Sequence, residues 1–173
     1  MKQSTVSAGE QLIQDYGTGK RSFPRLNLSG CNLSFTCLNH ILLSGANLSH
    51  SVLHGIDLIE ADLSRANLTA TKAMGANLTG IQLKLATLKF ALLSRSTLLN
   101  AQLDHANLEG SVMTGCNLRG ATLRHARCIG ADFKQADLSG ANLWGAELSL
   151  NDLSEAILWE TILPDGSIGQ SLP

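Results

Sequence analysis

Leucine recurs at every fifth residue along most of the chain. Counting every fifth residue from Phe23 to Ile168 gives thirty positions, and we call the residue at each of them the centre of its repeat. Twenty-four centres are Leu, and the others are Phe23, Ala73, Met113, Cys128, Phe133 and Ile168. On an α-helix, residues five apart differ by about 140°, so these leucines would spiral around the helix and form no apolar stripe. On a flat strand, residues five apart point to opposite faces. The pattern therefore predicts a solenoid, in which the chain turns about every five residues and returns each central residue to one interior.

The residues around each centre follow the same period. The residue two places before the centre is Ala in fifteen of the thirty repeats, which indicates a second inward position with little space. The residue directly before the centre is Asn or Asp in thirteen repeats, and such side chains hydrogen-bond to neighbouring backbone and favour turns. Gly is frequent two places after the centre, where a corner needs a positive φ.

This A(D/N)LxG pattern resembles the pentapeptide-repeat family over about residues 21–170. The resemblance implies an all-β fold, a right-handed quadrilateral β-helix, in which four pentapeptides form one square coil of twenty residues. Thirty repeats in groups of four then give about 7.5 coils. The central residue and the residue two before it would point inward. The expected core includes Leu28, Leu48, Leu68, Leu78, Leu98, Leu118, Phe133 and Leu138.

Residues 1–20 lie outside the repeat and predict a short helical cap over the first coil. Ser7 is a candidate N-cap and Gly17 a candidate end, and the face toward the coil would carry Val6, Leu12, Ile13 and Tyr16. A cap of this kind would protect the open edge of the solenoid. Pro164, Asp165 and Gly166 predict a turn that stops the ladder, and residues 171–173 form a tail. Both flanks look like those of cyanobacterial members of the family.

Targeting signals and cysteine usage both favour a cytoplasmic protein. Residues 1–20 lack a continuous apolar segment typical of a signal peptide, and no stretch has the length of a transmembrane helix. The four cysteines are Cys31, Cys37, Cys116 and Cys128, and none forms a CxxC pair. Three of them occupy inward positions, so we interpret them as core residues in a reducing compartment. We expect no cofactor and no membrane partner.

The sequence carries no motif that indicates catalysis. No Ser/His/Asp motif, phosphate-binding glycine loop or metal motif is present, so we predict that the protein is not an enzyme. His105 and His125 are twenty residues apart at corners and would stack about 5 Å from each other. Two imidazoles could share a metal ion, but a third ligand is hard to name. The alternative is a pair of solvated corner residues.

Charge and exposed apolar residues point to a binding surface. Residues 63–134 hold nine Lys and Arg against three acids, whereas residues 135–173 hold six acids and no Lys or Arg. The coil 81–100 departs most from the pattern and places four apolar residues outward, and Val112 stacks one coil beyond one of them. The predicted partner surface is Leu85, Phe90, Leu92, Leu99 and Val112. Scattered exposed residues are the alternative.

These patterns favour a non-catalytic scaffold that binds a protein through a flat side of the rod. The partner cannot be identified from the sequence. A homodimer through the 81–100 girdle or through the C-terminal end is an alternative assembly. Trp144 and Trp159 point outward near that end, and we expect them to pack under the C-terminal tail in preference to an end-to-end dimer contact. The resemblance also implies an alternative function, because some family members bind DNA gyrase by mimicking duplex DNA. Those mimics are acidic along the rod, and this sequence is basic in its middle. We do not expect direct binding of nucleic acid, since the basic segment lacks a series of aromatic stacking platforms among its Lys and Arg residues.

Overall fold

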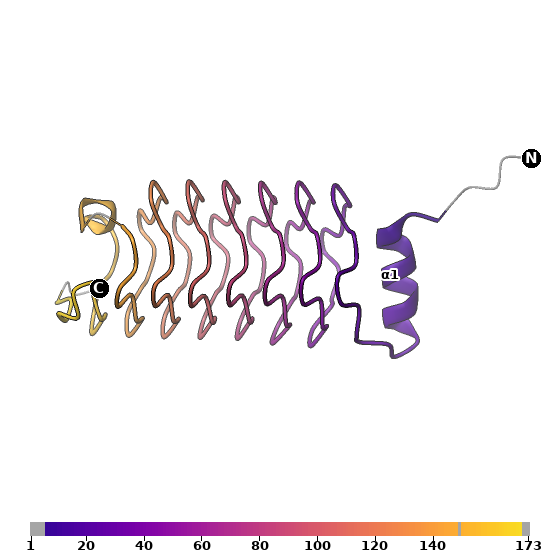
Figure 1. The fold of residues 1–173 in the computed structure, drawn as a ribbon, viewed down its shortest axis with the longest axis horizontal. Coiled ribbons are helices and arrows are strands. Elements are labelled where there is room, and N and C mark those ends of the chain that lie inside the picture. Colours follow the sequence, from indigo (N-terminus) through magenta and orange to yellow (C-terminus); the bar gives the residue numbers. More distant parts are fainter. Residues whose placement is uncertain (1–5, 149, 171–173) are drawn as a thin grey trace, which may run out of the picture.

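The chain winds into a rod of stacked coils (Figure 1). The computed structural model describes residues 6–148 and 150–170. Isolated parallel β-bridges join residues twenty apart, beginning with Ser22 to Leu42 and running to Asn142 to Ile162. The chain turns after each bridging segment, at intervals of five residues. Each coil is therefore a quadrilateral of four pentapeptides, and each bridging residue is the one directly before a centre.

Backbone hydrogen bonds run from coil to coil and account for the close stacking. The Leu48 N–H donates to the Asn67 carbonyl at 2.7 Å, and the Asn67 N–H donates to the Ala46 carbonyl at 2.9 Å. The Ser51 N–H donates to the Leu48 carbonyl at 3.1 Å and closes the corner between two sides. The same three bonds recur around the rod, so most backbone groups of the inner coils are satisfied without long strands.

The corners explain the Asn, Asp and Gly positions of the repeat. The Asn27 side-chain oxygen accepts from the Ser29 N–H at 3.2 Å, and the Asp137 oxygen accepts from the Ser139 N–H at 3.0 Å. This bond recurs in most repeats with Asn or Asp before the centre and confirms their predicted backbone role. Every residue two places after a centre has a positive φ from Arg25 to Gly145, and more of these residues are non-glycine than glycine.

The interior is filled by the central residues and by the small residues two places before them. All eight residues expected in the core are buried. They are Leu28, Leu48, Leu68, Leu78, Leu98, Leu118, Phe133 and Leu138. Alanine at the second inward position lets the four sides approach closely, so the rod has a narrow and continuous apolar core.

Helix α1 (Ala8–Gly17) lies against the N-terminal end of the rod (Figure 1). Ser7 is its N-cap, and a capping box with Glu10 satisfies the first turn. Leu12 is buried against the first coil. The Tyr16 hydroxyl donates at 3.0 Å to the carbonyl of Asn39, which belongs to the first coil and has no preceding coil to pair with.

The apolar side of α1 is narrower than the sequence predicts. Val6 and Ile13 were expected on the face toward the coil, but both are exposed. Gly9 faces the coil instead, where an added Cβ would lie 3.3 Å from Leu33. The close approach of the helix backbone to the coil leaves Leu12 as the buried large side chain of this contact, and Tyr16 is half-buried against the core.

The C-terminal end departs from the predicted register. A short 3₁₀ helix, η1 (Leu150–Leu153), interrupts the sequence of corners. The expectation that Ile168 is a thirtieth inward centre was wrong, whereas the turn predicted at Pro164, Asp165 and Gly166 is present. Ile168 is 51% exposed and pairs antiparallel with Ile162. The cause is the turn after Leu163, which accepts from the Gly166 N–H at 2.9 Å and reverses the chain.

Candidate interaction surface

The predicted girdle of coil 81–100 encircles the rod and does not form one patch. Leu85 and Phe90 are 51% and 55% exposed, whereas Leu92, Leu99 and Val112 are half-buried. Successive corners lie five residues apart, so Leu85, Phe90 and Leu99 stand at three different corners of the coil. Of the five residues, only Phe90, Leu92 and Val112 are neighbours, because Leu92 and Val112 form a bridge next to the Phe90 corner.

One side of the rod gathers these three residues with apolar residues from other coils. Consecutive bridges join Val52, Lys72, Leu92 and Val112 into one outward column, which continues to Asn32 at its N-terminal end and to Asp132 at its C-terminal end. We define the apolar face as this column with its corner residues, which are Phe90 on one edge and Phe35, Met74 and Arg95 on the other. Phe35 is 82% exposed, more than any other large apolar side chain in the described residues.

Sequence reasoning missed Phe35 and Met74 because it scanned single coils. Both residues precede the 81–100 coil, and among the described residues each is the only exposed large apolar residue of its own coil on this side. The signal was present in the sequence at a spacing of twenty. Residues twenty apart in the sequence lie in one column along the rod. Comparing these columns, and not single coils, groups Phe35 and Met74 with the Leu92 column.

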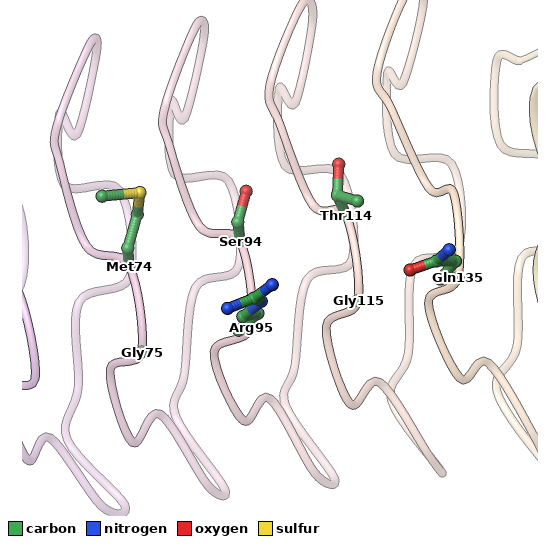
Figure 2. Close-up of a pocket in the computed structure, with 7 residues that line it drawn as sticks. All are labelled: Met74, Gly75, Ser94, Arg95, Thr114, Gly115 and Gln135. Carbon is green, nitrogen blue, oxygen red and sulfur yellow. The ribbon is translucent and has the colours of Figure 1, made fainter.

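The Met74 edge of the apolar face contains an open groove (Figure 2). The lining residues come from four successive coils and are Met74, Gly75, Ser94, Arg95, Thr114, Gly115 and Gln135. Gly75 and Gly115 have no side chains, so backbone forms part of the groove floor on both sides of Arg95. The Arg95 Cγ would lie 3.7 Å from a Cβ added at Gly115. The guanidinium is thus placed in a groove whose floor carries few side-chain atoms.

The N-terminal part of the apolar face carries unpaired positive charge. Within the described residues, neither Lys72 nor Arg95 makes an ion pair or a side-chain hydrogen bond. The segments of this side and its two corners are 29–35, 49–55, 69–75, 89–95 and 109–115, and Glu109 is their one acid. Glu109 is already held at 3.3 Å by Lys89 and at 3.3 Å by Arg127.

Glycines of the next coil position the two exposed phenylalanine rings. A Cβ added at Gly110 would lie 2.6 Å from Phe90 Cδ1, and one added at Gly55 would lie 2.7 Å from Phe35 Cδ1. Each ring therefore occupies the space that a side chain would fill one coil further along. Phe35 and Phe90 are exposed, but the coil beside them limits the positions available to their rings.

The two histidines singled out in the sequence stack as the register predicts. The ring centroids of His105 and His125 are 5.1 Å apart with an interplanar angle of 16°. Trp144 approaches His125 edge-on at 4.8 Å and extends the corner by one coil. No three His, Cys, Asp or Glu side chains in residues 6–148 and 150–170 are arranged to hold a metal ion. The corner is a short aromatic ridge, and the third aromatic member was not linked to it from sequence.

The carboxylate beside this ridge, Asp104, is paired with Arg124. Asp104 is buried and accepts hydrogen bonds from Arg124, from the Nε at 3.3 Å, the Nη2 at 2.8 Å and the backbone N–H at 3.1 Å. Burial pushes the pKa of Asp104 upward, but the hydrogen bonds from Arg124 outweigh it, and the pKa lies below its ordinary value. A carboxylate held in this way orders a corner and is not poised for proton transfer.

Buried thiols are equally unsuited to chemistry. Cys116 donates to the Leu93 carbonyl at 3.0 Å, and burial raises its pKa to about 11. Burial likewise raises the pKa of Cys128 to about 12. A nucleophilic cysteine needs a lowered pKa and access, and these two have neither. Cys31 is half-buried and Cys37 is exposed, and all four thiols are free.

Comparison with known families identifies the repeat. The family model described as pentapeptide repeats matches residues 27–65, 61–98, 101–140 and 131–165. No curated protein sequence matches the chain at a significant level. In the part of the chain that the structure describes, no helix has the length and apolar character needed to span a membrane.

Solved structures of the same architecture are similar to the chain. HetL, a pentapeptide repeat protein involved in heterocyst differentiation regulation from the cyanobacterium Nostoc sp. strain PCC 7120, is 30% identical. The alignment covers 91% of this chain and 98% of HetL, with a TM-score of 0.55. The pentapeptide repeat protein alr5209 from Nostoc PCC 7120 is 30% identical over 84% of each chain, with a TM-score of 0.26. Full-length QnrB1, a plasmid-mediated fluoroquinolone resistance protein, is 20% identical over 87% of this chain and 91% of its own, with a TM-score of 0.42.

Proposed function

This chain belongs to the pentapeptide-repeat family, and we propose that it is a non-catalytic scaffold that binds another protein through one side of its rod. The proposal includes a right-handed coil, about seven coils once the repeat centred on Ile168 is left out, and α1 as the cap of the first coil. The observation that carries it is the apolar face. Contiguous apolar surface on an otherwise regular and polar repeat often marks a protein contact.

The arrangement of polar groups supports a scaffold over an enzyme. Catalysis needs polar groups that converge in a concave site. In the described residues, the buried acid Asp104 is bound by Arg124. The buried thiols of Cys116 and Cys128 have raised pKa values. Arg95 is the single ionisable side chain that lines the groove. This lining can dock a side chain of a partner but does not supply an acid and a base.

The distribution of cations argues against the gyrase-binding alternative. A rod that mimics duplex DNA must present negative charge along its length. Here the N-terminal and middle coils expose cations that have no ion-pair partner within the described residues, among them Arg25, Arg65, Lys72, Lys84 and Arg95. The acidic residues gather after residue 134. We therefore keep the scaffold as the proposed function.

We further propose a regulatory setting in the cytoplasm of a cyanobacterium. HetL is involved in the regulation of heterocyst differentiation, and its 30% identity over nearly the whole chain supports a regulatory role for this protein. Four free cysteines suit a reducing compartment. An end-to-end homodimer through the exposed Trp144 and Trp159 stays a prediction that sedimentation equilibrium can test.

The experiment is affinity capture with the intact chain from a lysate of its source organism, followed by reconstitution. A captured protein that binds the purified chain at one defined stoichiometry in isothermal titration calorimetry supports the scaffold. A captured small molecule that is chemically changed by the purified chain would contradict it. A Leu98→Ala variant serves as the control for binding by a partly unfolded chain, because Leu98 is in the core and does not touch the surface.

A further inference from the structure

We propose that the apolar face recognises a protein segment in which apolar side chains are flanked by Asp or Glu. This inference rests on the proposed function and specifies the chemistry of the partner. It follows from two observations on the same side of the rod. One is the set of exposed and half-buried apolar side chains on this side, and the other is the pair of unpaired cations, Lys72 and Arg95, that lies among them.

The order of residues along the column sets the chemistry of the partner. Successive coils place Val52, Lys72, Leu92 and Val112 in line, with about 4.8 Å between neighbouring coils. The column therefore alternates from apolar to cationic and back to apolar. A bound segment gains by burying apolar groups against Leu92 and Val112 and by placing a carboxylate within reach of Lys72. A purely apolar segment would leave this ammonium group desolvated and unpaired, which is costly.

Arg95 provides a second carboxylate position at the edge of the face. It lies between Gly75 and Gly115, and Figure 2 shows no side chain on the backbone at either position. A guanidinium binds a carboxylate with two parallel hydrogen bonds, and this geometry needs open space beside the group. Met74, from the preceding coil, lines the same groove and can contact an apolar side chain next to that carboxylate.

A second copy of this chain is a poor occupant. The acidic region after residue 134 is the complementary surface by charge, but several of its acids are already paired. Asp137 is bound by Arg119 at 3.3 Å, Glu147 lies 3.9 Å from Arg127, and Glu155 lies 3.7 Å from Lys134. Carboxylates held by their own chain would have to break these pairs to reach another copy. A separate acidic segment has no such cost.

Nucleic acid fits the face less well than an acidic protein segment. Strands are bound by a track of cations with aromatic faces free for stacking. The apolar face has two unpaired cations, and its phenylalanine rings lie against Gly55 and Gly110. Two cations would bind the phosphates of a strand only weakly. The aliphatic residues of the column would also stay exposed to water.

The test selects random linear peptides on phage against the intact purified chain. Enriched peptides are synthesised, and their dissociation constants are measured by fluorescence anisotropy at two salt concentrations. We expect peptides with net negative charge and apolar residues, and weaker binding at higher salt. Selected peptides that show no excess of Asp and Glu, or a selection that enriches no peptide, would overturn the inference.

Matched variants place the binding on the rod. The Lys72→Glu/Arg95→Glu double variant should weaken binding by about tenfold or more, because each change replaces attraction by repulsion. The control is Arg65→Glu/Lys84→Glu, which changes the net charge equally at exposed cations on the corner diagonally opposite Arg95. It should weaken binding by less than about twofold at moderate salt. Equal losses in both variants would show only general electrostatics and would overturn the inference.

Failure of this inference and failure of the scaffold have different signatures. If a lysate partner binds the Lys72→Glu/Arg95→Glu variant as tightly as the wild type, the scaffold stands and the apolar face is not its site. If no protein binds the chain with a defined stoichiometry, the scaffold itself fails. Circular dichroism of both double variants checks that the coil is retained, which we expect because all four side chains are exposed.

Discussion

Replacing Gly110 by Ala would test how the apolar face is held in place. Gly110 and Gly75 have the same φ of 65°, and both lie at corners on the two edges of the apolar face. They differ in their surroundings. An added Cβ at Gly110 would meet the Phe90 ring at 2.6 Å, whereas one at Gly75 meets nothing within 4 Å. Gly75→Ala is therefore the matched control, since it carries the same backbone strain without the ring.

The two variants should differ in stability by about 1 kcal/mol. A non-glycine residue in the left-handed region costs about 1–2 kcal/mol. The reduced entropy of the unfolded chain returns about 0.4–1 kcal/mol of this. Gly75→Ala should therefore cost about 0.5–1 kcal/mol. Gly110→Ala carries the same cost and also forces the Phe90 ring from its position, which adds about 0.5–1.5 kcal/mol for a displaced side-chain torsion.

Urea denaturation of the two variants, each in wild-type and Phe90→Ala backgrounds, measures the cost of backbone strain and the cost of displacing the Phe90 ring. The extra cost of Gly110→Ala should disappear when Phe90 is Ala, while the cost of Gly75→Ala should not change. Equal unfolding free energies for the two glycine variants would refute the ring contact. An extra cost that persists without the ring would mean that strain at the Gly110 corner itself is responsible.

Three further outcomes follow from the burial and charges of single residues. Leu98→Ala should lower the unfolding free energy by about 2–5 kcal/mol, and Leu92→Ser by less than about 1 kcal/mol, as measured by urea denaturation; the reverse order would disprove the inward register. Asp104 has a lowered pKa in the folded chain, so its contribution to stability is present above the unfolded pKa and is lost as the pH falls through the folded value. The unfolding free energy of Asp104→Asn should therefore change less than that of the wild type between pH 5 and pH 2, and an equal change would show that other carboxylates dominate. At pH 8 a thiol reagent should label Cys37 quickly and Cys116 only in denaturant, because burial raises the pKa of Cys116 to about 11; fast native labelling of Cys116 would show that the coils open.

The sequence predicts the inside of this rod better than its outside. The period of five determines which residues point inward, because small and apolar side chains recur at the positions that face the narrow core. The same period predicted the stacking of His105 and His125. The period alone misplaced Ile168, because Ile168 keeps the apolar spacing although it follows the turn that Pro164, Asp165 and Gly166 predict.

The candidate surface was only partly accessible from the sequence. Phe90 and Leu92 stood out because their coil lacks the usual Asn and Gly residues. Phe35 and Met74 are single apolar residues in coils that otherwise carry polar residues outward, so they do not stand out until four-sided stacking places them on the same side of the rod. Within the described residues, Lys72 and Arg95 are unpaired because other cations form the ion pairs with acids of neighbouring coils. The sequence alone does not show which cations form these pairs.

The most direct test of the central claim is site-specific photocrosslinking to the captured partner. A photoreactive phenylalanine analogue is placed at Phe90 in one sample and at Leu85 in another. These corner residues are 55% and 51% exposed, have similar φ values and lie five residues apart in one coil, but only Phe90 borders the apolar face. The account predicts a crosslink to the partner from position 90 and little or none from position 85. A crosslink from position 85 alone, or equal crosslinks from both, would contradict it.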